Sequence, residues 1–208
     1  NLPPAVQVLF NGLRLEQMFT VYITAFMLAP LFLIMPLMFS SVVGADSFVG
    51  ERERKTMEAL LYAPTTDIEL FLGKVLAAVI PAVSLSWLTY LVYIIVVNAG
   101  TFNMFGRIWF PLAPWWPMMF WLTPAFAVLG ISATVMISAR VKTFMEAYPL
   151  TGSLVVVVLA LVVGQATGVL VLGVGTVILI GTILWIVDAV LIYFNLRSFN
   201  RSSLIANL

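Results

Sequence analysis

Charged residues are the candidates for chemistry in this chain, because they are few and unevenly placed. The 208 residues include ten lysines and arginines and nine aspartates and glutamates, with no histidine and no cysteine. Ten of these 19 charged residues lie in one segment, from Asp46 to Lys74. The lack of histidine and cysteine removes the usual zinc, haem, Ser-His and Cys-His centres. Function therefore has to be argued from a few polar positions.

The segment Glu51–Tyr62 consists mostly of good helix formers and predicts a short amphipathic helix. Met57, Leu60 and Leu61 recur at helical spacing and form one apolar stripe. Glu53 departs from this pattern, because it falls on the apolar stripe one turn before Met57. We expect the stripe to lie on lipid or in a groove of a partner protein.

Two signals mark the end of this helix and the start of the next. Pro64 ends the first helix, because proline has no backbone N–H to donate and its ring clashes with the preceding turn. Thr66–Glu69 has the spacing of a capping box, in which the Thr and Glu side chains satisfy backbone N–H groups at a helix start. The alternative is a solvated loop whose basic residues only mark the cytoplasmic side of a membrane.

The composition of the chain indicates that its solvent is lipid. Hydrophobic residues make up 62% of the sequence and charged residues 9%, with a mean hydropathy of +1.11. A soluble domain is roughly 45–50% apolar and about 25% charged, and a chain of this size has too much exterior to hide such an excess. This composition excludes a soluble domain, a disordered tail and a nucleic-acid-binding module, and the net charge of +1 gives nucleic acid no attraction.

The uncharged stretches between the charged clusters have the lengths of membrane spans. Runs of 29, 32, 32 and 41 uncharged residues separate the clusters, and a spanning helix needs about 20 apolar residues. The longest run has room for two spans that meet at the polar segment 164–168. Barrel strands are disfavoured, because the apolar run 155–163 does not alternate with polar residues. We therefore predict an all-α membrane protein with five transmembrane helices, at about 20–44, 74–98, 115–139, 148–164 and 172–194.

The distribution of lysine and arginine sets the expected orientation. Eight basic residues fall on one side of the predicted spans and two, Arg14 and Arg107, on the other. The richer side is expected to be cytoplasmic in a multi-pass protein of a plasma membrane, of the prokaryotic cytoplasmic type. The chain then divides into an extracytoplasmic segment 1–19, a transmembrane domain 20–194 with cytoplasmic loops 45–73 and 140–147, and a cytoplasmic tail 195–208.

The charge run also resembles a known family. Residues 50–61, followed by Pro64 and by Gly73-Lys74, are similar to the E-R-E-x-x-T-x-E-x-L-L-x-x-P…G-K pattern of permease subunits of type-two ATP-binding-cassette (ABC) transporters. In that family the pattern lies between the second and third spans and forms the cytoplasmic coupling region that docks on the ATPase. The resemblance implies an exporter-like permease. It assigns ATPase coupling to Glu51, Arg52, Glu53, Arg54, Thr56, Glu58, Leu60, Leu61 and Pro64.

The resemblance also implies partners. The chain lacks the phosphate-binding sequence G-x-x-x-x-G-K-[ST], because Gly73-Lys74 is followed by valine and has no glycine at the required spacing. We therefore expect no cofactor on this chain and no ATPase activity of its own. ATP and Mg²⁺ would be bound by two copies of a partner ATPase. A second permease copy, or a paralogue, would complete the substrate pathway in the lipid bilayer.

A second cytoplasmic contact is expected at the short charged loop 140–147. Its charged residues are Arg140, Lys142 and Glu146. In the functional interpretation they form a smaller ATPase contact. In the alternative they are a topology signal, with Glu146 paired locally.

The number of spans departs from the family pattern. Such permeases usually have six spans, and this sequence predicts five, the first of which resembles the family's second. One branch of the family carries a large extracytoplasmic insert after its first span, and residues 1–19 would suit the end of such an insert. A shorter permease with five spans is the alternative.

Asp188 is the intramembrane polar candidate. It lies inside the last predicted span, about two turns from the cytoplasmic end. A carboxylate at mid-bilayer costs on the order of 2.5–3.5 kcal/mol on insertion scales and tends to be functional. A structural or subunit-pairing role and a substrate or proton role are both open, and Arg197 and Arg201 are candidate ion-pair partners.

An ATP-independent protein is the alternative function. A secondary transporter more often has several intramembrane charges or inverted repeats. Asp188 alone gives such a transporter little support, and no repeat is visible in the sequence. A membrane assembly scaffold belongs to the same alternative.

Overall fold

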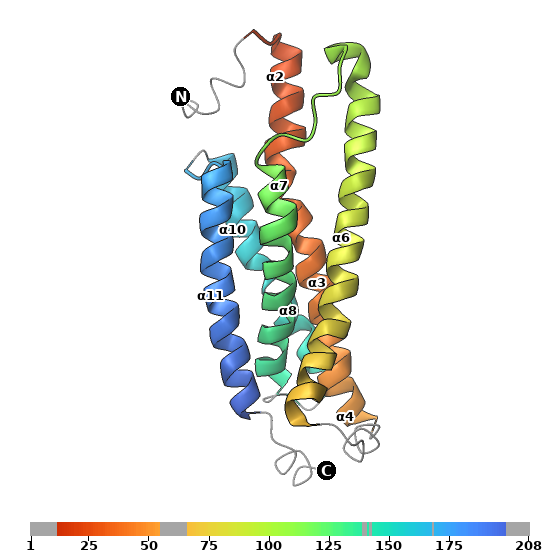
Figure 1. Cartoon of the computed structure of the whole chain (residues 1–208), viewed down its shortest axis with the longest axis vertical. Helices are drawn as coiled ribbons and strands as arrows, with labels where there is room; N and C mark the ends of the chain where they lie inside the picture. Colours follow the sequence, from red (N-terminus) through yellow and green to blue (C-terminus); the bar gives the residue numbers. More distant parts are fainter. Residues whose placement is uncertain (1–11, 55–65, 139–140, 142, 168, 199–208) are drawn as a thin grey trace.

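The computed structural model describes residues 12–54, 66–138, 141, 143–167 and 169–198. The described residues form helices and connecting segments, with no strand among them. The long helices run side by side along one axis (Figure 1). Four are long and apolar enough to cross a membrane, and a fifth apolar helix is shorter. The predicted all-α membrane class is confirmed.

The first span is longer and less regular than the sequence predicts. The span covers Leu15–Gly50, a length of 36 residues, and is helical except for a bend at Leu28. Pro30 lies in a tighter 3₁₀ segment between a π-helical segment and α3, because a proline cannot make the regular α-helical hydrogen bond. In chain order the segments are α2 (Leu15–Val21), π-helical Tyr22–Met27, 3₁₀ Ala29–Leu33, α3 (Ile34–Ala45), π-helical Asp46–Gly50 and α4 (Glu51–Glu53).

The second span, α6 (Asp67–Phe105), is a single helix of 39 residues that continues through Pro81. Its start is the capping box that the sequence predicts. The Glu69 amide donates to Thr66 Oγ1 at 3.2 Å, and the Thr66 amide donates to Glu69 Oε2 at 2.8 Å. Its end is Gly106, whose φ of 63° places it in the left-handed region that glycine favours. At 1.5 Å per residue α6 is about 58 Å long, well beyond the roughly 30 Å of a hydrocarbon core.

The third span is the most buried helix of the bundle. It comprises α7 (Trp115–Pro117), π-helical Met118–Leu122 and α8 (Thr123–Ser138). Small residues allow α8 to approach α3 closely. A Cβ added at Gly130 would lie 2.6 Å from the Leu37 carbonyl oxygen and 2.4 Å from Ser40 Oγ. Glycine is therefore required at this crossing, as in many membrane helix pairs.

Two helices lead the chain back to the end of the bundle where α2 begins, whereas the sequence predicts one helix, at 148–164. α9 (Phe144–Gly152) and α10 (Val155–Ala166) are separated by a turn at Ser153 and Leu154. The predicted break follows α10, where the Leu170 amide donates to the Gly164 carbonyl at 2.9 Å. The last span is α11 (Val174–Ser198), which packs against α8.

The main core lies in the half of the bundle near α2 and α7. Trp115 is its centre: its ring stacks on Tyr90 and Tyr93 with centroids 5.6 Å apart in each pair. Its indole N–H donates to the Ala25 carbonyl at 2.9 Å. The core therefore ties α6, α7 and the first span together near one end. Two smaller apolar clusters, one around Phe48 and Phe71 and one around Val49 and Ala147, pack the opposite end.

Candidate functional site

Apart from Asp188, the described charged residues that the sequence singles out for a functional site lie at one end of the bundle. The end of the first span, the start of α6 and the start of α9 meet there, close to the end of α11 (Figure 1). We call this end, where residues 46–54, 66–74 and 143–147 lie, the loop end. The opposite end, which carries residues 12–17 and 102–112, is called the far end.

A buried lysine joins the first span to α6 at the loop end. Lys74 Nζ donates to Glu51 Oε2 and to the Ser47 carbonyl oxygen, each at 2.5 Å. The ammonium lies 5.1 Å from the centroid of the Phe48 ring. Phe48 in turn packs on Phe71, with ring centroids 6.1 Å apart. Only 8% of Lys74 is exposed. The two ends of the family-like pattern, the Glu of E-R-E and the Lys of G-K, are thus in direct contact.

This ion pair is a structural clamp as well as a charge contact. A buried pair contributes little net stability compared with an apolar pair, but removing one partner leaves an uncompensated charge. Glu51 is only half-buried, so water screens part of the interaction. The pair fixes the end of the first span against the start of α6.

The two predicted cytoplasmic segments are linked through Glu53. Its Oε2 accepts a hydrogen bond of 2.9 Å from the backbone N–H of Phe144, the first residue of α9. The first N–H groups of a helix have no partner within the helix and favour a negative charge. This contact accounts for the glutamate at position 53, which departs from the predicted apolar stripe, because Glu53 caps a helix that begins 91 positions further along the chain.

A second ion pair lies along the same turn. Arg54 pairs with Asp46, and both side chains are largely exposed. A Cβ on Gly50 would lie 2.6 Å from Asp46 Oδ1 and 3.1 Å from Arg54 Nη2. The missing side chain at Gly50 leaves room for this pair to cross the helix.

Several of the predicted site residues lie outside the described residues. These are Thr56, Glu58, Leu60, Leu61, Pro64, Arg140 and Lys142. For Arg52 only the backbone position in α4 is described. Glu146 lies in the first turn of α9, is exposed, and donates its backbone N–H to Thr143. The structure therefore brings Glu53 together with the start of the second segment, whereas Glu51 pairs with Lys74 and Arg54 with Asp46.

Asp188 lies far from this cluster along α11. It is completely buried within the single chain, and neither carboxyl oxygen has a hydrogen-bond partner among the described residues. Arg197 does not pair with it, because its guanidinium stacks over Tyr193 at 4.7 Å, and Arg201 lies outside the described residues. The expected ion pair with Arg197 is absent.

Lys74 and Asn98 are the polar residues whose roles the sequence left unassigned. Lys74 follows Phe71 and Leu72 in an apolar helix. A buried cation in such a helix needs a partner, so the position of Lys74 in the sequence could have indicated an ion pair. Asn98, near the end of α6, holds the loop that follows this helix, because its side chain is hydrogen-bonded to the backbone of Trp109 and Phe110. No group of three or more Asp, Glu, His or Cys that could bind a metal occurs in the described part of the chain.

The fold and the polar loop end are those of a multi-pass membrane protein whose charged segments converge on one face. The chain belongs to the family described as ABC-2 family transporter protein, whose model matches residues 6–202. It is thus a membrane transport component of the ABC class, as the charge pattern suggested. Neither the curated proteins nor the solved structures include a significant match to the chain.

Proposed function

We propose that this chain is the permease subunit of an ABC exporter and that its loop end receives a separate ATPase. The ATPase would bind residues 50–64 and the start of α9, at 143–147. The hydrogen bond from Phe144 to Glu53 is the observation that carries this proposal. It joins the described end of the first segment to the start of the second, so that a displacement of either would be passed to the first span, α6 and α9 together.

The energy source would be ATP and Mg²⁺ bound by two copies of that ATPase. Family membership supports this division of labour, and the given sequence has no phosphate-binding loop of its own. Two permease copies, or this chain and a paralogue, would form the substrate pathway between them. ATPase closure would then favour one of two arrangements of the spans over the other.

The orientation that fits this mechanism puts the loop end in the cytoplasm. The excess of lysine and arginine on that side supports this orientation. The last described helix, α11, ends at the same end (Figure 1), so the tail that follows it would also be cytoplasmic, in a prokaryotic cytoplasmic membrane.

Co-purification with the ATPase tests the proposal. The tagged chain is expressed with a candidate Walker-motif ATPase from the same genome, and both the bound ATPase and the rate of ATP hydrolysis are measured. Glu53→Lys and Glu58→Lys should each reduce the bound ATPase at least about fivefold, which corresponds to roughly 1 kcal/mol of lost contact. Glu53→Lys also removes the α9 cap, whereas Glu58 belongs to the predicted contact surface alone.

The matched control is Glu16→Lys, which reverses an exposed glutamate at the far end. It should bind the ATPase and support hydrolysis as the unchanged chain does. Normal binding and hydrolysis in both Glu53→Lys and Glu58→Lys would show that the ATPase docks elsewhere.

A further inference from the structure

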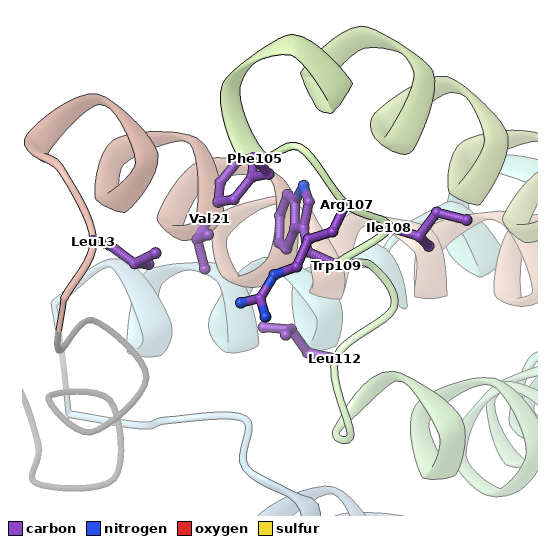
Figure 2. A pocket seen from close by; sticks show the side chains of 7 residues that line it. All are labelled: Leu13, Val21, Phe105, Arg107, Ile108, Trp109 and Leu112. Atoms are coloured by element: carbon purple, nitrogen blue, oxygen red, sulfur yellow. The ribbon is translucent and has the colours of Figure 1, made fainter.

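A pocket opens at the far end of the bundle, away from the proposed ATPase surface. It measures about 340 Å³ and lies between α2, the end of α6 and the loop 106–112 (Figure 2). Ligand pockets for small molecules usually measure about 300–1,000 Å³. The pocket is lined by Leu13, Val21, Phe105, Arg107, Ile108, Trp109 and Leu112.

A buried asparagine holds the wall of this pocket in place. Asn98 Oδ1 accepts hydrogen bonds from the amides of Trp109 and Phe110, at 3.0 and 3.2 Å. Its Nδ2 donates to the carbonyls of Phe110 and Ile94, at 2.7 and 2.9 Å. The loop at 109–110 is therefore fixed to α6 by one side chain that uses both its donors and its acceptor.

The tryptophan in the pocket is fixed as well. The Trp109 ring stacks on Phe105 with centroids 4.8 Å apart, and its indole N–H donates to Thr101 Oγ1 at 2.8 Å. On the opposite wall, Gln17 Nε2 donates to the Met104 carbonyl at 2.8 Å, which ties α2 to α6. A pocket held by such contacts is preorganised, which lowers the entropy cost of binding.

Arg107 is the one charge among the pocket residues. Its guanidinium lies between Val21 and Leu112, whereas Ile108 points the other way (Figure 2). Arg107 has no hydrogen bond or ion pair with another described residue. An arginine fork without a carboxylate partner suits the oxygens of a phosphate.

The surroundings favour an acyl chain beside that phosphate. Leu15 and Ile108 at the same end are 71% and 76% exposed, and such exposure of large apolar side chains is expected where lipid is the solvent. Tryptophan is also enriched where a membrane meets water. The pocket thus offers apolar walls to a chain and a cation to its headgroup.

We propose that this far-end pocket binds an anionic phospholipid, with its phosphate on Arg107 and its acyl chain against Trp109 and Phe105. The site is separate from the ATPase surface and does not depend on the direction of transport. Tight binding in this pocket requires both the anionic headgroup and the acyl chain of the ligand. A free phosphate and a lipid of no net charge should therefore each bind less well.

Quenching of tryptophan fluorescence by brominated lipids tests this site. The full chain is placed in nanodiscs containing phosphatidylglycerol or phosphatidylcholine with brominated acyl chains. Trp109→Phe gives the background from the other five tryptophans. The quenching of Trp109 should show an affinity for phosphatidylglycerol about fivefold above that for phosphatidylcholine, the size expected of a partly exposed ion pair.

Two arginine variants separate the pocket from general attraction to an anionic surface. Arg107→Gln should abolish the preference and Arg107→Lys should keep part of it. Arg14→Gln, which removes the other basic residue of the far end and does not line the pocket, should leave the preference unchanged. Because Arg107 is exposed, Arg107→Gln should unfold at the same temperature as the unchanged chain.

Three outcomes would overturn the proposal. The first is equal quenching by the two lipids, and the second is a preference that survives in Arg107→Gln. The third is displacement of brominated phosphatidylglycerol by inorganic phosphate at the same concentration, which would mean that the acyl chain contributes nothing.

Discussion

The carboxylate of Glu53 accepts a hydrogen bond from the backbone N–H of Phe144, 91 residues further along the chain. This bond joins the end of the first span to the start of α9. It converts two segments that are distant in sequence into one polar face. The loop end can therefore be dissected by variants that open its contacts one at a time.

Removing the Glu53 carboxylate should loosen the start of α9. We expect Glu53→Gln to raise hydrogen exchange at the Phe144 amide by about threefold, because a neutral amide caps a helix start less well than an anion. Exchange measured by mass spectrometry on fragments spanning 143–147 checks this. Glu16→Gln at the far end should leave these fragments unchanged, and an unchanged rate in Glu53→Gln would show that the bond contributes little.

The Glu51–Lys74 pair should behave as a coupled unit. Lys74→Met leaves a half-buried carboxylate and Glu51→Gln leaves a buried ammonium, so each should cost about 1–3 kcal/mol once screening by water is included. The double variant should cost less than the sum of the two single variants. Unfolding in mixed detergent micelles measures all three.

The matched control for this cycle is Arg54→Gln, which opens the exposed pair with Asp46. It should change stability by less than about 1 kcal/mol. Strictly additive effects of Glu51→Gln and Lys74→Met would contradict the clamp.

The crossing of α3 and α8 should tolerate no side chain at Gly130. Gly130→Ala places a methyl group 2.6 Å from a backbone carbonyl, which cannot rotate away. We expect a loss of about 1–3 kcal/mol, as for other overpacked positions. Gly175→Ala in α11 is the control, because nothing lies within 4 Å of its added Cβ, and there the substitution should be neutral or stabilising. Equal effects of the two substitutions on the unfolding midpoint would rule out the close contact.

Asp188 should be replaceable by a neutral side chain of the same shape. A charge with no partner inside a membrane protein is costly, so Asp188→Asn should keep or raise the unfolding temperature, and Asp188→Lys should lower the yield of folded protein. Size-exclusion chromatography and thermal unfolding measure both. A marked loss of stability in Asp188→Asn would show that the carboxyl group itself makes an essential contact.

Local signals in the sequence predicted much of the fold. The Thr66 cap, the break after Gly164 and the apolar spans depend on neighbouring residues, and such patterns can be read without tertiary information. The split of the fourth span into α9 and α10 was missed, although Thr151, Gly152 and Ser153 interrupt its apolar run at the turn. Proline at position 149, inside α9, was a second hint.

The candidate site was predicted as a region and not as a set of contacts. Glu51, Glu53 and Lys74 were visible as charges, but their partners lie 23 and 91 positions away. Only the fold brings such pairs together, so no local sequence pattern predicts these contacts. Glu53 illustrates the difference between a local pattern and a tertiary contact. Its charge departs from the predicted amphipathic pattern, and in the fold its carboxylate caps another helix.

Because α6 is long, a small change in its tilt would move its distant end a large way. One helix, closed by the Thr66 cap at one end and by Gly106 at the other, spans the distance between the Lys74 clamp and the Arg107 pocket. A tilt of about 10° about Lys74 would carry the end of α6 at Phe105, about 46 Å away along the helix, sideways by about 8 Å. A small rotation of α6 at the loop end would thus be a larger displacement at the far end.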